Sequence, residues 1–262
     1  MDHLPYFRQE VAAFAAAAHT AAAEAAPIVP SCPSWSVSDL VLHLGSVHRY
    51  VTRTIAERLT TPPDPADRGS LHLPADLDGW PDPLTAPNTG PVPGGLVDWF
   101  AEGAAGLAEL FETTDPAVTV WTWSAEQSVG FWLRMQTIEA AVHRWDLENA
   151  LGSPAPLPAE PAADAVVQTF EVMAPTRRAW LQAPAGSGER MAFRQTDGDA
   201  LWTVTFSGDE ILLGSDGTGD VELAGTASDL ALFLWQRIPA SQLEVKGDTG
   251  VLDRYFTLVP PV

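Results

Sequence analysis

A glutamate and a histidine four residues apart are the side chains of this sequence with the clearest capacity for chemistry. They are Glu139 and His143 in the stretch IEAAVHRWDLE, and on a helix this spacing puts both on one face. A carboxylate and an imidazole placed in this way can share one divalent cation. Asp146 follows on the same stripe and could orient the imidazole from behind. The alternative is that these residues are ordinary polar neighbours on an exposed helix.

A third ligand must come from another helix, and the stretch SVSDLVLHLGSVHRYV offers two histidines, His43 and His48. Five positions at about 100° per residue separate them by about 140°, so they cannot both face one cation. Each lies on a face of the helix that also carries apolar residues. Their angular positions around the helix axis therefore do not show which of the two faces the cation. The one that is not a ligand is expected to be a hydrogen-bonded histidine of the core.

Four helices are expected to position these groups, because apolar residues recur there with the helical period. They are expected over residues 5–26, 37–59, 96–112 and 129–150. Ser36 and Asp39 form the pattern of a capping box at the start of the second helix. Residues 61–95 are crowded with Pro, Gly and Asp and predict a long irregular connection. These features predict a four-helix bundle over residues 1–152.

The second half of the chain has a different sequence pattern from the first. The Pro-rich residues 153–161 are expected to form a linker, and residues 162–182 a helix. Short strand-like runs separated by Gly- and Asp-rich turns follow. They are MAFRQT, LWTVTF, EILLGS and DVELAG. Together with a helix over residues 228–237 and the run LEVKGD, they predict a small α+β domain with an antiparallel sheet over residues 162–262.

Composition excludes some classes of function. The chain has 262 residues, 14 Lys and Arg against 34 Asp and Glu, and a net charge of −20. A nucleic-acid or acidic-membrane partner is not expected, because each needs a basic surface that this sequence lacks. The polar residues interrupting the N-terminal stretch argue against a signal peptide or a membrane span. A monomer is expected, since no heptad or edge-strand signal indicates otherwise.

The single cysteine, Cys32, can form no internal disulfide, which fits a reducing cytoplasm. It is expected to be a buried packing residue, with a nucleophile as the alternative. Several aromatic residues lie on the expected bundle helices and could line an apolar pocket. We take Tyr50 and Trp132 as candidates for contact with a cofactor, with core packing as the alternative for both.

Two stretches resemble the mycothiol-dependent maleylpyruvate isomerase family, which has a DinB-like metal-binding bundle. The first, SCPSWSVSDLVLHLGSVHRYV, matches a run of Cys or Thr, Pro, any residue, Trp and Ser or Thr, followed by Leu-x-x-His. The second, IEAAVHRWDLENALG, matches Glu-x-x-x-His followed by Asp-Leu. The matching residues are Cys32, Pro33, Trp35, Ser36, Leu40, His43, Glu139, His143, Asp146 and Leu147.

The resemblance implies a ligand set of His43, Glu139 and His143, with His48 left to pack or to support it. GTASDLALFLWQR and LEVKGD look like the family's C-terminal, sterol-carrier-like domain. Arg237 falls where the family carries an arginine implicated in the active site, with a surface salt bridge as the alternative. Residues 61–95 match nothing in the family and are expected to border the site.

Two imidazoles and one carboxylate leave open coordination positions, as in catalytic metal sites. Zn²⁺ is the first expectation, although Fe²⁺, Ni²⁺ and Mn²⁺ accept the same ligands. The resemblance implies that mycothiol binds this cation as its thiolate and adds to an electrophilic small molecule. The outcome would be S-transfer or cis–trans isomerisation, and the enzyme a transferase or isomerase.

Two other functions are consistent with the same residues. One is a tailoring enzyme of secondary metabolism that uses the same metal site without a thiol. The other is a metal- or ligand-binding protein without turnover, because fold alone does not imply function. A cleft at the metal large enough for a thiol and a second reactant would favour an enzyme.

Overall fold

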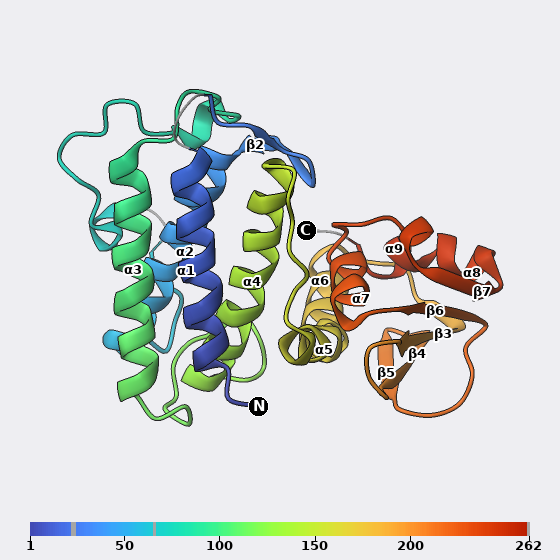
Figure 1. The fold of residues 1–262 in the computed structure, drawn as a ribbon. Helices are drawn as coiled ribbons and strands as arrows, with labels where there is room; N and C mark the ends of the chain where they lie inside the picture. The colour runs from blue at the N-terminus through green and yellow to red at the C-terminus, as the bar shows by residue number, and fades with distance from the viewer. Residues whose placement is uncertain (22–24, 65–66, 261–262) are drawn as a thin grey trace. The chain divides into compact units, whose positions relative to one another are not determined.

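Four long helices make up most of the first unit, Met1–Ala155, of the computed structural model, which describes residues 1–21, 25–64 and 67–260 (Figure 1). They are α1 (Leu4–Ala21), α2 (Val37–Ala56), α3 (Gly94–Thr113) and α4 (Val129–Ala150). Helices α1 and α2 each pack against both α3 and α4, so the four enclose one apolar core. The expected bundle is confirmed.

The helix ends follow local backbone chemistry. At the start of α2, Asp39 accepts a hydrogen bond from the Ser36 backbone N–H at 2.8 Å, and Ser36 Oγ accepts one from the Asp39 N–H at 3.3 Å. This is the expected capping box. The helix ends at Ala56 rather than at residue 59, because Arg58 has a φ of 51°. A left-handed residue just past a helix redirects the chain.

The first helix is shorter than expected. The prediction ran to residue 26, but residues 25–27 are not helical, and residues 22–24 lie outside the described part of the chain. The Ala26 N–H donates instead to the carbonyl of Gly90 at 2.9 Å. Pro27 follows directly, and a residue before proline is disfavoured in the helical conformation.

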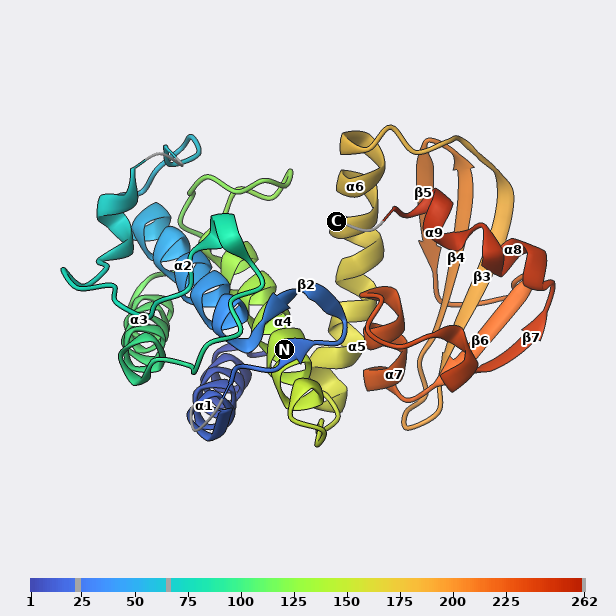
Figure 2. The same ribbon diagram turned by 90° about the horizontal axis from the view of Figure 1, so that it is seen from above.

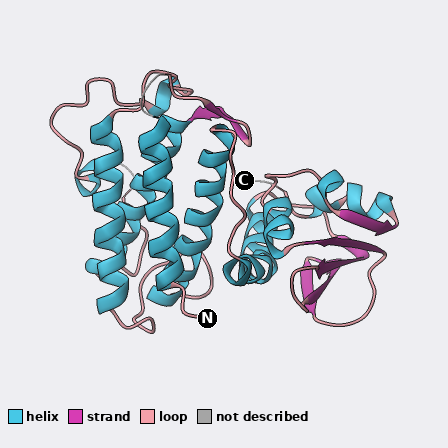
Figure 3. Ribbon diagram, in the orientation of Figure 1, coloured by secondary structure: helices cyan, strands magenta, loops and turns pink. Residues whose placement is uncertain are grey.

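A small two-stranded sheet, β1 (Ile28–Val29) and β2 (Cys32–Ser36), precedes α2 and was not expected. The long connection between α2 and α3 is irregular, as expected, apart from two short 3₁₀ helices in its described residues. They are η1 (Arg68–Leu71) and η2 (Pro83–Thr85). Figure 3 shows that loop and turn dominate this stretch.

The second unit, Pro156–Val262, begins with one long helical stretch. Its parts are α5 (Ala159–Gln168), the π-helical turn η3 (Thr169–Met173) and α6 (Ala174–Trp180). The helix starts at Ala159 rather than at residue 162, so its first residues were wrongly assigned to the linker. Pro161 is tolerated there because a proline in the first turn of a helix sacrifices no helical hydrogen bond.

A five-stranded sheet in the order β5-β4-β3-β6-β7 forms the rest of this unit's core (Figure 2). The strands are β3 (Gly186–Gln195), β4 (Leu201–Gly208), β5 (Glu210–Gly214), β6 (Val221–Gly225) and β7 (Glu244–Gly247). The expected antiparallel pairing holds except that β3 and β6 run parallel. Because β4 already occupies one side of β3, residues 215–220 carry the chain across to its other side.

Short helices α7 (Ala227–Leu234), α8 (Thr249–Asp253) and α9 (Tyr255–Leu258) complete the unit. The Tyr255 side chain is fully buried among aromatic rings. Its ring neighbours include Phe193, Phe206 and Phe233, with centroids 5.8 to 6.4 Å away. Among the described residues, none of the helices combines the length and the apolarity that a bilayer span requires.

Close packing of α2 on α3 gives a testable consequence. A Cβ at Gly45 would overlap the ring of Trp99, whereas one at Gly106 of α3 would meet nothing within 4 Å. We expect Gly45→Ala to lower the free energy of unfolding by about 1–3 kcal/mol through overpacking. Gly106→Ala should instead be neutral or stabilise by up to about 1 kcal/mol. Chemical denaturation of both variants checks this, and equal effects would contradict the packing described.

Candidate metal centre

Helices α2 and α4 bring three potential ligands together. His43 comes from α2, and Glu139 and His143 come from successive turns of α4. Glu139 Oε1 lies 3.7 Å from His43 Nε2 and 4.0 Å from His143 Nε2. One ligand atom of each residue lies within 4.8 Å of the other two. Ligand atoms bound to one zinc ion at about 2.0–2.2 Å have separations of about 3.5 Å, so the arrangement fits a shared cation.

The imidazole of His143 is oriented by a carboxylate behind it. Its Nδ1 lies 2.9 Å from Oδ2 of the fully buried Asp146. Because an ionised carboxylate only accepts hydrogen bonds, Nδ1 carries the proton and the lone pair of Nε2 points toward Glu139. The other oxygen of Asp146 accepts a hydrogen bond from Ser31 Oγ at 2.6 Å. Ser31, in the turn between β1 and β2, was missed by the sequence analysis.

Glu139 is held on its other side by Gln136, whose Nε2 donates to Oε2 at 2.9 Å. Burial alone would raise the pKa of Glu139, but the facing His43 and His143 outweigh it and lower the pKa. Burial lowers the pKa of His143, and Asp146 only partly opposes that effect. At neutral pH the pair therefore holds a carboxylate and a neutral imidazole, which are the forms that bind a cation.

His43 forms the accessible side of the cluster. Its side chain is 33% exposed, compared with 6% for His143, and its ring packs on Trp35 of β2 with centroids 4.7 Å apart. Both rings line a cavity of about 750 Å³, and Tyr50 is another residue of its wall. Of the three potential ligands, His43 belongs to this lining, so the cluster meets a cavity of ligand size at that residue.

Trp132 and Arg237 are the two remaining candidate residues. Trp132 is buried, and its indole N–H donates to the Trp121 carbonyl at 2.8 Å. It packs on Tyr50, with ring centroids 6.4 Å apart, so it supports a residue of the cavity wall. Arg237 belongs to the second unit, where its Nη1 donates to the Trp235 carbonyl at 2.7 Å. The proposed roles of Trp132 and Arg237 stay predictions.

His48 lies in the core of the bundle and is not one of the three converging side chains. It is fully buried, with Phe7 and Phe100 each 5.4 Å from its ring centroid. The expectation of a hydrogen-bonded histidine is wrong, because within the described residues neither ring nitrogen has a hydrogen-bond partner. Burial lowers the pKa of His48 to about 3, so this imidazole is neutral and packs as an aromatic ring.

The buried neutral His48 predicts a pH dependence of stability. The unfolded side chain gains a proton below its ordinary pKa of 6.5, and the folded one does so only near 3. Stability is therefore present above pH 6.5 and is lost as the pH falls toward 3. Between pH 7.5 and 5, wild type should lose about 2 kcal/mol relative to His48→Leu. Denaturation curves check this, and a pH-independent difference would contradict it.

Cation binding gives the second test of this site. We expect His43→Ala, Glu139→Gln and His143→Ala to abolish stoichiometric binding of Zn²⁺ in calorimetric titrations. Asp146→Asn should keep the stoichiometry but weaken the affinity by about 10- to 100-fold, because the imidazole loses its charged partner. The matched control is Asp98→Asn, which removes an exposed carboxylate on α3. Wild-type affinity in the Asp146 variant would show that this hydrogen bond does not support the site.

Comparison with known proteins gives a consistent result for both units. The family model for the mycothiol maleylpyruvate isomerase N-terminal domain matches residues 7–148. The model for the C-terminal domain of that family, abbreviated MDMPI, matches residues 160–254. No curated protein sequence gives a significant match.

Two solved structures share the fold. They are mycothiol-dependent maleylpyruvate isomerase, with a TM-score of 0.56, and a histidine-to-alanine mutant of mycothiol-dependent maleylpyruvate isomerase, with a TM-score of 0.57. Each is 14% identical to this chain, and the alignments cover 93% of this chain and 91% of theirs.

Proposed function

Since this chain belongs to the mycothiol-dependent maleylpyruvate isomerase family, we propose that it is a metal-dependent enzyme that adds the thiol of mycothiol to an electrophilic small molecule. The product would be a thioether after S-transfer, or a cis–trans isomer if the thiol is eliminated again after bond rotation. The observation that carries the proposal is the convergence of His43, Glu139 and His143 beside a ligand-sized cavity.

The donor set fits a catalytic cation. Two imidazole nitrogens and one carboxylate oxygen suit Zn²⁺ first, and Ni²⁺, Fe²⁺ or Mn²⁺ as well. When bound, such a cation stabilises a thiolate relative to its thiol, so the nucleophile exists at neutral pH. No protein base is then needed to take the thiol proton.

Side chains of this protein orient the proposed ligands and hold protons at defined atoms. Asp146 keeps the proton of His143 on Nδ1, so the opposite nitrogen stays free to bind. Burial raises the pKa of Tyr50 on the cavity wall, so its hydroxyl stays protonated and can donate a hydrogen bond to a reactant oxygen. Trp132 packs against the Tyr50 ring and limits its movement. We also assign Arg237 to the site, on the family resemblance.

The cavity beside His43 supports turnover rather than storage of an ion. A protein that only binds a metal needs no open cavity beside its ligands, whereas His43 lines one. The matched family is also named for an enzyme, an isomerase. We further propose that the protein acts in a reducing cytoplasm, since a chain with a single cysteine forms no internal disulfide. We propose that it acts as a monomer, since no heptad or edge-strand signal in the sequence indicates otherwise.

An activity assay tests the proposal directly. Zinc-loaded protein is mixed with mycothiol and an electrophilic alkene, and thioether formation and isomerisation are followed by chromatography. We expect turnover that disappears without mycothiol, without the cation, and in the His43→Ala variant. Turnover that persists without mycothiol would favour an enzyme that uses the same metal without a thiol.

The assignment of Arg237 has its own test. Arg237→Lys should lower kcat by about tenfold or more if the guanidinium contacts the reactants, because lysine cannot reproduce its fork of donors. Zinc stoichiometry should stay unchanged, since Arg237 is not a proposed ligand. The control is Arg194→Lys, which alters a surface pair with Glu222 in the same unit. Equal activity of the two variants would remove Arg237 from the site.

A further inference from the structure

A second cavity of the first unit is lined by residues of α2, α3 and the turn around η1. Its volume is about 550 Å³, which is enough for a small organic molecule. The three potential metal ligands are not part of this lining. The cavity meets the one beside His43 at Asp67 and Ser70, which line both. It is therefore a separate space next to the candidate metal centre.

Arg49 brings a buried positive charge to this second cavity. It lines the cavity and is only 8% exposed. Among the described residues it has no ion-pair partner, and its one hydrogen bond runs from Nη2 to the Trp99 carbonyl at 2.9 Å. Its Nε is buried without any acceptor in the same part of the chain. A buried charge without a contacting counter-ion costs free energy that a bound anion would recover.

Arg49 remains charged in spite of its burial. Burial lowers the pKa of Arg49, and the negative charge of Glu102 opposes this effect only in part. A guanidinium nevertheless stays protonated at neutral pH, because its ordinary pKa lies far above 7. The cavity therefore contains a permanent cation whose hydrogen-bonding capacity is mostly unused.

The guanidinium of Arg49 is held in position by its neighbours. Its Cζ lies 4.7 Å from the centroid of the Trp99 ring, and the indole N–H of Trp99 donates to the Leu71 carbonyl at 3.0 Å. On α3, a Cβ at Gly103 would lie 3.3 Å from both Cζ and Nε of Arg49. The glycine thus leaves room beside the guanidinium that a side chain would fill. A cation fixed in this way is preorganised for a ligand.

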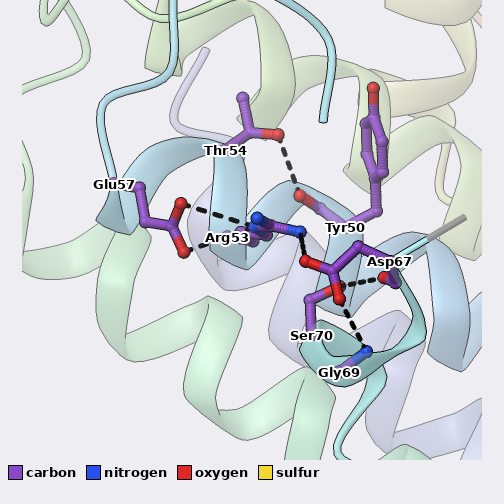
Figure 4. A network of polar contacts seen from close by, with 7 residues as sticks. All are labelled: Tyr50, Arg53, Thr54, Glu57, Asp67, Gly69 and Ser70. Atoms are coloured by element: carbon purple, nitrogen blue, oxygen red, sulfur yellow. Dashed lines mark hydrogen bonds and ion pairs between the residues drawn. The ribbon is translucent and has the colours of Figure 1, made fainter. Parts of the chain in front are cut away.

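Two of the acidic residues in the lining are already paired with another arginine. Figure 4 shows Arg53 between Glu57 and Asp67, with nitrogen-to-oxygen separations of 3.3 Å and 2.8 Å. Asp67 also accepts a hydrogen bond from the Gly69 backbone N–H at 3.0 Å. These contacts tie both carboxylates to Arg53, so neither of them is the counter-ion of Arg49.

The uncharged polar groups of the lining suit a ligand with hydroxyl groups. Thr52 Oγ1 donates to the His48 carbonyl at 2.9 Å, and Ser70 Oγ donates to the Asp67 carbonyl at 3.3 Å. Each hydroxyl oxygen can still accept a hydrogen bond. His72 adds an imidazole to the same lining. A hydroxylated molecule can therefore form hydrogen bonds along the cavity wall.

The acidic residues of the lining favour a ligand of low negative charge. Glu57, Asp67 and Glu102 all line the cavity, and the net charge of −20 adds a field of the same sign. They repel a doubly charged phosphate about twice as strongly as a carboxylate. The edge of a guanidinium, in contrast, pairs with two oxygens of either group. A single carboxylate therefore gains the contact with Arg49 at the smaller cost.

We propose that this second cavity binds a small hydroxylated carboxylate, which Arg49 holds by charge-assisted hydrogen bonds. Trp99 and Gly103 set the position of the guanidinium, and the hydroxyl groups of Thr52 and Ser70 meet the rest of the ligand. The site goes beyond the proposed function, because it involves neither the metal ligands nor a chemical step.

Binding of matched probes tests the ligand class. Gluconate and gluconamide share one hydroxylated chain and differ in the charge of the terminal group. Full-length protein is first freed of metal by a chelator, which is then removed, so that gluconate meets no cation. We expect calorimetry to show gluconate binding at least about tenfold more tightly than gluconamide, and more tightly than inorganic phosphate. Equal affinity for the amide, or tighter binding of phosphate, would overturn the proposal.

Variants assign the binding to this cavity. Arg49→Met should abolish gluconate binding, whereas Arg8→Met, which removes a surface pair with Glu112, should not change it. Because Arg49 is buried, a second variant leaves it in place. Gly106→Leu puts a side chain into the cavity, where a Cβ meets nothing within 4 Å, and should also abolish binding. The matched control is Gly95→Leu, on α3 outside the lining. With folding confirmed by circular dichroism, wild-type affinity in the Gly106 variant would overturn the proposal.

Repeating the titration with zinc-loaded protein separates this cavity from the candidate metal centre. The gluconate affinity measured without metal should remain in zinc-loaded wild type and disappear in zinc-loaded Gly106→Leu. Gluconate binding that appears only with zinc, and that Gly106→Leu does not change, would place the carboxylate on the metal and overturn the proposal.

Discussion

A largely buried carboxylate held between two imidazoles of different helices is the interaction on which this structure depends. Glu139 faces His143 on its own helix and His43 on α2, so the register between α2 and α4 must be right to within a fraction of a helical turn. That register is set by the core of the bundle, in which α1 packs on α4, α3 packs on α2, and α1 and α3 pack on each other. The bundle can therefore be understood as the scaffold that holds these three side chains in convergence.

The site is also held from outside the bundle helices. The short β1–β2 sheet presents Ser31 to Asp146, and Asp146 fixes the tautomer and the direction of His143. The same sheet carries Trp35, whose ring packs on His43. Both histidines are thus constrained by one small element at the start of α2. The long connection after α2 then forms one wall of the cavity, whereas α2, which carries the proposed ligand His43, forms the other.

The sequence predicts correctly those features that depend on local interactions. The bounds of α4 were predicted correctly from the helical period of its apolar residues, and in the structure Ser128 caps its start. The spacing of Glu139 and His143 predicted their common face, but rotation alone could not choose between His43 and His48. That choice needed the family resemblance. Contacts between distant segments, such as Ser31 with Asp146, and the parallel pairing of β3 with β6 depend on tertiary structure and leave no local signal.

X-ray absorption spectroscopy of the zinc-loaded protein identifies the atoms bound to the metal. We expect a shell of only nitrogen and oxygen at about 2.0–2.2 Å, with scattering from two imidazole rings. Addition of mycothiol should introduce one sulfur at about 2.3 Å. A sulfur ligand before the thiol is added, or a spectrum without imidazole scattering, would contradict the ligand set of His43, Glu139 and His143.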